Sequence, residues 1–127
     1  MNATHLEIAV WAASVLLALF YVIAGGTKAV IPKRKLQNQQ RMAYVADLSV
    51  AQIKVVGVVE VAGAIGVILP HLTGIASLLS AVAAFALAAV QVVAIILHLR
   101  RREYAIIFNL VLLVLAIVVG TGLVAVL

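Results

Sequence analysis

Long apolar runs constrain this chain more than any other feature of its sequence. Residues 72–98 and residues 104–127 contain no Asp, Glu, Lys or Arg, and two earlier runs contain only Glu7, Lys54 and Glu60. A helix needs about 20 apolar residues to cross the hydrocarbon core of a bilayer. The runs therefore predict four transmembrane helices, at residues 6–26, 49–69, 72–98 and 104–127.

The composition excludes the soluble alternatives. Hydrophobic residues make up 67% of the 127 residues and charged residues only 10%, whereas a soluble domain has about 25% charged residues. A disordered chain is polar and poor in apolar residues, and a β-barrel strand shows alternating polarity over about ten residues. We therefore expect an all-α membrane protein, a four-helix up-down bundle that forms a single domain over residues 1–127.

The basic residues predict the orientation of this bundle. All nine lie between or beside the facing ends of spans one and two, or between spans three and four. The positive-inside rule places these segments in the cytoplasm, so both termini are expected outside, in a multi-pass protein of the cell inner membrane. The net charge of +5 then reflects topology and attraction to anionic lipids, and we expect no nucleic-acid partner.

Small residues mark the faces along which the helices are expected to pack. In lipid, helices associate through close contact of small side chains, and the third predicted span carries four such residues at four-residue spacing. These stripes favour packing within the bundle, with a homo-oligomer contact as a further use. The predicted packing residues are Gly57, Gly63, Gly66, Ala76, Ser80, Ala84 and Ala88.

The connections carry several local signals. Gly25–Gly26 is expected to end the first helix, and residues 70–74, with Pro and Gly at their ends, predict a tight turn. Residues 33–46 are polar and basic, and the pattern fits either a short interfacial helix or a solvated loop. Ser49 and Gln52 fit a capping box at the start of the second span.

Polar residues gather in the cytoplasmic half of the predicted spans. Glu60 lies near the bilayer midplane, where a charge costs at least about 2.5–3.5 kcal/mol. Polar groups from the other three helices lie in the same half, whereas the outer half holds only small hydroxyls. We therefore expect a polar cavity open to the cytoplasm, with ligand-binding residues Glu60, Lys28, Tyr21, Gln91, His98 and Asn109.

Two interpretations of Glu60 stay open at this stage. It is either a proton carrier or ligand anchor, or a structural tie that is hydrogen-bonded to Gln91, Tyr21 or Asn109. Lys54 is expected to extend toward the cytoplasmic surface, and Lys28 either does the same or reaches Glu60.

The same sequence predicts no metal site. It contains no cysteine, and His5 and His71 are expected to be interfacial residues at the ends of different helices. Catalytic residues remain unknown, since the chain lacks a nucleophile–base set, a phosphate-binding loop and zinc-ligand spacing.

The segment at residues 53–66, with Gly57, Glu60 and Gly63, resembles the signature of the DoxX-like family of small four-helix membrane proteins. Residues 24–28 and 98–103 fit the same family pattern. The resemblance extends over residues 15–120 and implies the four-helix fold, with Lys28, Gly57, Glu60, Gly63 and His98 as matching positions. Family members resemble a membrane subunit of a thiosulfate:quinone oxidoreductase, and others belong to membrane complexes or act as assembly chaperones.

We therefore expect an integral membrane subunit that binds a quinone or a similar lipid-soluble ligand near Glu60. Such a subunit supports a membrane oxidoreductase system through a membrane or peripheral redox partner, since the chain has no redox-active side chain of its own. It would be an accessory subunit rather than a catalyst on its own. The alternative is a non-catalytic scaffold or assembly factor for a membrane complex.

Overall fold

The computed structural model describes residues 3–104 and 106–127, and the described residues form helices and connections with no β-strand. Four of the helices are long and apolar enough to cross a membrane, which confirms the predicted class. The elements are α1 (Ala3–Val30), α2 (Lys33–Leu36), the 3₁₀ helix η1 (Gln40–Asp47), α3 (Val50–Thr73), α4 (Leu78–Arg100) and α5 (Ile107–Ala125).

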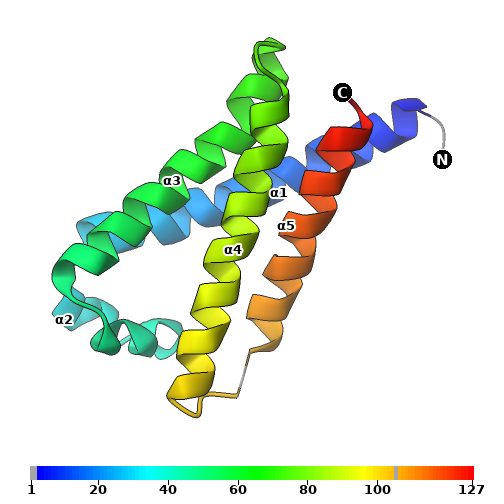
Figure 1. Cartoon of the computed structure of the whole chain (residues 1–127). Coiled ribbons are helices and arrows are strands. Elements are labelled where there is room, and N and C mark those ends of the chain that lie inside the picture. Colours follow the sequence, from blue (N-terminus) through cyan, green and yellow to red (C-terminus); the bar gives the residue numbers. More distant parts are fainter. Residues whose placement is uncertain (1–2, 105) are drawn as a thin grey trace.

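The four long helices form a closed ring of neighbours. Helix α1 packs on α3, α3 on α4, α4 on α5, and α5 contacts α1 again. Figure 1 shows the start of α1 and the end of α5 at one end of the bundle, near the α3–α4 turn. We call this the termini end. Helix α2, η1 and the α4–α5 connection lie at the opposite end, which carries the lysines and arginines and is called the basic end.

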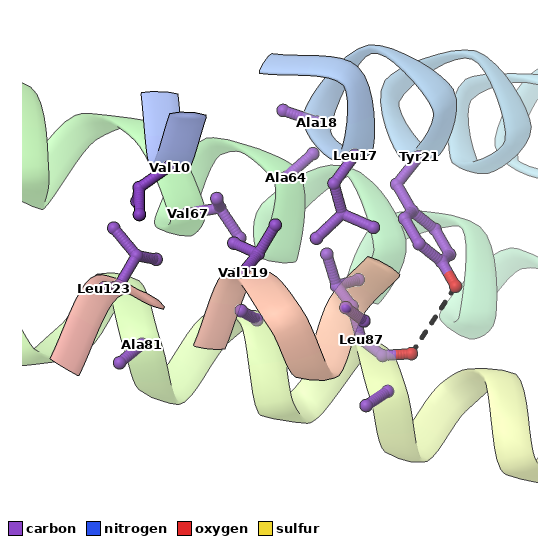
Figure 2. Packing of buried hydrophobic residues seen from close by; sticks show 13 residues of the cluster. Val10, Leu17, Ala18, Tyr21, Ala64, Val67, Ala81, Leu87, Val119 and Leu123 are labelled. Atoms are coloured by element: carbon purple, nitrogen blue, oxygen red, sulfur yellow. Dashed lines mark hydrogen bonds between the residues drawn. The ribbon is translucent and has the colours of Figure 1, made fainter. Parts of the chain in front are cut away.

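The bundle interior is apolar toward the termini end. Leu17, Val67, Leu87 and Val119, one from each long helix, are fully buried and belong to one hydrophobic cluster (Figure 2). The opposite helix faces carry exposed apolar side chains such as Leu16, which is 62% exposed. An apolar outer surface on membrane-length helices is suited to lipid, so the chain is a multi-pass membrane protein.

Two predicted helix ends are wrong. Helix α1 continues through Gly25–Gly26 and stops at Val30, before Pro32, because Gly25 packs against another helix instead of ending its own. Helix α3 continues past Pro70 to Thr73, since a proline in the last turn removes only one helical donor. The helix ends at Gly74, which has a φ of 72° and donates its N–H to the Pro70 carbonyl.

The third and fourth spans begin later than predicted. Helix α4 starts at Leu78, so Ala76 lies in the α3–α4 turn, is exposed and has a φ of 51°. Its prediction as a helix-packing residue is therefore wrong, because α3 uses the preceding residues for its last turn. Helix α5 begins at Ile107 rather than at residue 104.

The segment before α3 folds as two short helices against the basic end. Leu36 of α2, together with Tyr44 and Val45 of η1, is buried with Ile53 in a second hydrophobic cluster. The predicted capping box is confirmed: the Gln52 N–H donates to Ser49 Oγ, and the Ser49 N–H donates to Gln52 Oε1. The segment is thus held on the bundle by Leu36, Tyr44 and Val45, while side chains such as Arg34 and Lys35 are exposed.

Candidate functional site

The site begins where α1 crosses α3. Gly25 and Gly57 face each other so closely that a Cβ on either would lie 2.6 Å from the carbonyl oxygen of the other. Only residues without a side chain allow this approach of two backbones. Each glycine is followed one turn later by a charged residue, Lys28 on α1 and Glu60 on α3. The crossing therefore brings the two charges together.

Lys28 and Glu60 form an ion pair inside the bundle. Lys28 Nζ donates to Glu60 Oε1 at 2.5 Å, and the two residues are 6% and 1% exposed. Of the two predicted directions for Lys28, the structure has the one toward Glu60. The carboxylate is buried at this contact. Its hydrogen-bond partner is Lys28 rather than Tyr21, Gln91 or Asn109.

A second buried contact joins α1 to α4. The Tyr21 hydroxyl donates to Gln91 Oε1 at 2.8 Å and lies 3.5 Å from the Leu87 carbonyl (Figure 2 shows the latter contact). Tyr21 and Gln91 are 1% and 4% exposed. The amide nitrogen Nε2 of Gln91 is buried and finds no acceptor among the described residues. A buried donor without a partner costs free energy, so this atom is suited to an acceptor supplied by another molecule.

Tyr44 of η1 joins the same group from the basic end. It is buried, its hydroxyl interacts with Lys28, and its ring centroid lies 4.7 Å from that of His98. Burial raises the pKa of Tyr44, and the positive charge of Lys28 opposes that rise. Sequence reasoning missed Tyr44, because nothing in a polar, basic connection indicates that one of its tyrosines folds back into the bundle.

Charged residues close the basic end over these groups. His98 Nδ1 lies 3.4 Å from Glu103 Oε1, and Arg101 Nε lies 3.3 Å from the same oxygen. Arg101 NH1 also pairs with Asp47 Oδ1 at 3.0 Å, which ties η1 to the end of α4. We call Tyr21, Lys28, Tyr44, Glu60, Gln91 and His98 the polar cluster.

One predicted ligand residue has no side-chain hydrogen bond to this cluster within the described parts of the chain. This residue is Asn109, which is half-buried on α5. The structure thus brings together Glu60, Lys28, Tyr21, Gln91 and His98, with the first four linked in two pairs.

Lys54 has a different role from the one predicted. Instead of extending to the surface, its Nζ donates to the carbonyl oxygens of Lys28 at 3.2 Å and Ile31 at 3.1 Å. These carbonyls at the end of α1 have no helical partners of their own. Lys54 therefore caps α1 and holds its last turn against α3.

Two of the remaining predicted packing residues, Gly63 and Gly66, lie between α3 and α4. A Cβ on Gly63 would lie 2.7 Å from Leu87 Cδ2, and a Cβ on Gly66 would lie 3.0 Å from the Ala83 Cβ. Ser80, Ala84 and Ala88 of α4 are buried. Residues 3–104 and 106–127 contain no group of three or more His, Cys, Asp or Glu that could hold a metal ion.

Four membrane-length helices with a buried ion pair between the first and the second define a small helical membrane protein of the multi-pass class. The family model described as the DoxX-like family matches residues 12–119. The chain belongs to this family, as residues 53–66 predicted. Comparisons with curated proteins and with solved structures gave no match.

Proposed function

We propose that this chain is a membrane subunit that binds the polar head of a lipid-soluble ligand at the polar cluster. A quinone is the proposed class of ligand. The observation that carries the proposal is the Gln91 Nε2 donor, which is buried and unpartnered among the described residues. A quinone carbonyl is an acceptor that carries no charge, so it can satisfy this donor in an apolar setting at little desolvation cost.

The neighbouring side chains support the same assignment. The Tyr21 hydroxyl donates to Gln91 Oε1 and thereby orients the amide, so that Nε2 is the atom available to a ligand. Lys28 on α1 offers a second donor to a quinone with two carbonyl oxygens, and Glu60 on α3 offers an acceptor to a hydroxyl of the reduced quinol. Redox chemistry would come from the quinone and from a partner protein, since the chain contains no cysteine.

The cluster is closed around the ion pair, so a head group must displace a side chain to bind. Lys28 is suited to this movement, because its flexible stem lies within one turn of the end of α1 at Val30. When Nζ turns to donate to an oxygen of the head group, the Glu60 carboxylate can accept from a quinol hydroxyl, so neither charge is left without a partner. When no ligand is bound, Lys28 and Glu60 pair with each other.

We also propose that the basic end faces the cytoplasm. Lysines and arginines lie on this end of the bundle, which fits the positive-inside rule. The chain has no cysteine, so single cysteines introduced at Thr4 and at Arg102 can be tested separately with a membrane-impermeant thiol reagent on intact cells. Labelling of Thr4→Cys alone supports this orientation, and labelling of Arg102→Cys alone contradicts it.

The binding proposal is tested by extracting and identifying the lipids that the purified protein retains. Wild type is expected to retain a quinone, and Gln91→Leu to lose it, because leucine fills the space without the amide donor. Ser14→Ala is the matched control: Ser14 Oγ is also buried and unpartnered but lies in the apolar part of the bundle. A wild-type protein that retains no quinone and co-purifies with another protein would favour the scaffold alternative.

A further inference from the structure

The acidic residues of the basic end are all engaged in ion pairs within the chain. The sequence has four acidic residues, Glu7, Asp47, Glu60 and Glu103. Glu7 lies near the start of α1 at the termini end, Glu60 pairs with Lys28, and Asp47 and Glu103 both pair with Arg101. Within the described residues, the other basic side chains of the basic end therefore have no unengaged carboxylate to pair with.

Exposed basic side chains lie at two places on this end. Arg34 and Lys35 are exposed on α2 and form the α2 patch, and Arg100 and Arg102 are exposed where α4 ends and form the α4 patch. Figure 1 shows α2 and the α4–α5 connection at the same end of the bundle. In the part of the chain that the structure describes, none of these four side chains takes part in an ion pair or a hydrogen bond. Both patches thus carry positive charge that the chain itself leaves uncompensated.

The α2 patch is fixed to the bundle although it belongs to a connection between two spans. Leu36, the residue after Lys35, is fully buried in the second hydrophobic cluster. Lys33 Nζ donates to the Leu48 carbonyl at 2.6 Å, which joins the two ends of the connection. The exposed cations of α2 are therefore presented by a folded surface, and a partner that binds there does not have to order the segment first.

Exposed apolar side chains place both patches at the level of the lipid headgroups. Val30, at the end of α1 and one turn before Arg34, is 78% exposed, and Tyr104, two residues after Arg102, is 69% exposed. Apolar side chains at the ends of membrane-length helices face lipid, and tyrosine is enriched where the bilayer meets water. The phosphate groups of the surrounding phospholipids lie at this same level, beside the basic side chains.

We propose that the α2 patch and the α4 patch bind the headgroups of anionic phospholipids in the leaflet around the basic end. The inference does not depend on the proposed quinone site or on which side of the membrane the basic end faces. A zwitterionic headgroup carries its own positive charge, whereas an anionic headgroup brings a net negative charge to cations that have no carboxylate partner. The planar guanidinium of arginine also matches the oxygens of a phosphate group, so direct contact adds to attraction at a distance.

The experiment compares two phospholipids that share the same acyl chains, phosphatidylglycerol and phosphatidylcholine. The purified protein is mixed with equal amounts of both in detergent micelles, and native mass spectrometry counts the lipids that it retains. We expect wild type to prefer phosphatidylglycerol by about fivefold or more, because one basic residue at an anionic surface already contributes about that much. Added salt is expected to reduce this preference, since it screens exposed charges.

Two double variants remove one patch each. Arg34→Gln with Lys35→Gln removes the α2 patch, and Arg100→Gln with Arg102→Gln removes the α4 patch. The four side chains are exposed and unpartnered within the described residues, so folding is not at risk. Each double variant is expected to lower the preference by roughly twofold or more, because the other patch still binds.

Two control variants separate the patches from the charge of the whole protein. Thr4→Glu with Leu127→Glu lowers the net charge by the same amount at exposed positions of the termini end and is expected to keep the preference. Arg100→Lys with Arg102→Lys keeps the charge of the α4 patch and is expected to retain most of the preference.

Three results would overturn the inference. Equal retention of the two lipids by wild type would show that the patches do not bind anionic headgroups. A loss of preference in the termini-end control as large as in the patch variants would assign the effect to net charge. Displacement of phosphatidylglycerol by an equal concentration of inorganic phosphate would identify the patches as sites for the free anion rather than for lipid.

Discussion

At the termini end the helices meet mainly through apolar side chains, whereas at the basic end charges and hydrogen bonds join them as well as apolar contacts. Leu17, Val67 and Val119 pack there without a polar contact, while Lys28 and Glu60 pair at the crossing of α1 and α3. In a bilayer, burying apolar side chains brings no hydrophobic gain, so the helices of the termini-end half associate through close packing. The comparison shows that the buried ion pair and the buried Tyr21–Gln91 hydrogen bond lie in the basic-end half.

The largest expected difference between the halves comes from breaking the ion pair. Lys28→Met leaves the Glu60 carboxylate buried without a partner, which costs about 3–5 kcal/mol of stability. Ser14→Ala in the termini-end half removes a hydroxyl that has no partner within the described residues and is expected to be close to neutral. Unfolding in mixed micelles, followed by circular dichroism, measures both.

The double variant Lys28→Met with Glu60→Leu is the control for this prediction. Replacing both members of a buried pair with apolar residues is often neutral or stabilising, so most of the lost stability is expected to return. A Lys28→Met protein as stable as wild type would show that the ion pair does not hold the basic-end half together.

The neighbouring residues Gly25 and Gly26 test how closely α1 and α3 pack at their crossing. Gly25→Ala places a methyl group 2.6 Å from the Gly57 carbonyl oxygen, and overpacking of this kind costs about 1–3 kcal/mol. Gly26→Ala places the same methyl group where no atom lies within 4 Å and gains helix propensity of about 1 kcal/mol. The same unfolding assay is expected to give opposite signs for the two variants, and equal effects would argue against a tight crossing.

Raising the pH above about 10 is expected to lower the stability of the fold through Tyr44 of η1. Burial raises the pKa of Tyr44 above its ordinary value of 10.0. The unfolded chain therefore loses this proton at a lower pH than the folded chain, and stability is lost as the pH rises from about 10 through the folded pKa. The loss has a limit of about 1.4 kcal/mol per pH unit for one group.

Tyr44→Phe isolates this contribution, since phenylalanine keeps an aromatic ring at the His98 contact and cannot ionise. A stability–pH profile of the variant should be flatter above pH 10 than that of wild type. Superimposable profiles would mean that Tyr44 ionises in the folded protein as it does in water.

The smallest effect is expected at the surface of the basic end. The Arg101–Asp47 pair is partly exposed, with side-chain exposures of 31% and 49%, and exposed pairs contribute about 0–1 kcal/mol. Asp47→Asn should therefore change stability little, and added salt should weaken wild type slightly more than the variant. If Asp47→Asn lost as much stability as Lys28→Met, the surface pair rather than the buried pair would be the main stabilising interaction of the basic end.

The sequence was sufficient for the features that depend on composition and on local contacts. Apolar runs predict four membrane-length helices because crossing a bilayer imposes a minimum length. Glu60 is recognisable as unusual because it lies deep in its apolar run, where a charge is costly in a bilayer. The capping box at Ser49 and Gln52 is also predictable, since its two hydrogen bonds join residues three apart.

Features that depend on distant contacts were not predictable. Gly25–Gly26 has the composition of a helix end, and only the presence of Gly57 alongside shows that Gly25 serves the crossing. Tyr44 reaches the polar cluster through the fold of residues 33–47, which the sequence left open. From the sequence, Lys28 could reach either the cytoplasmic surface or Glu60, and the crossing of α1 and α3 determines that it pairs with Glu60.

The central claim is that the Gln91 amide donates to the head group of a bound quinone. The most direct test is the infrared stretching band of an isotopically labelled carbonyl in a benzoquinone probe bound to the protein. We predict that wild type shifts this band to lower frequency than that of the free probe, and that Gln91→Leu, which is expected to lose the probe, shows only the band of the free probe. A band at the same position in both proteins would contradict the claim.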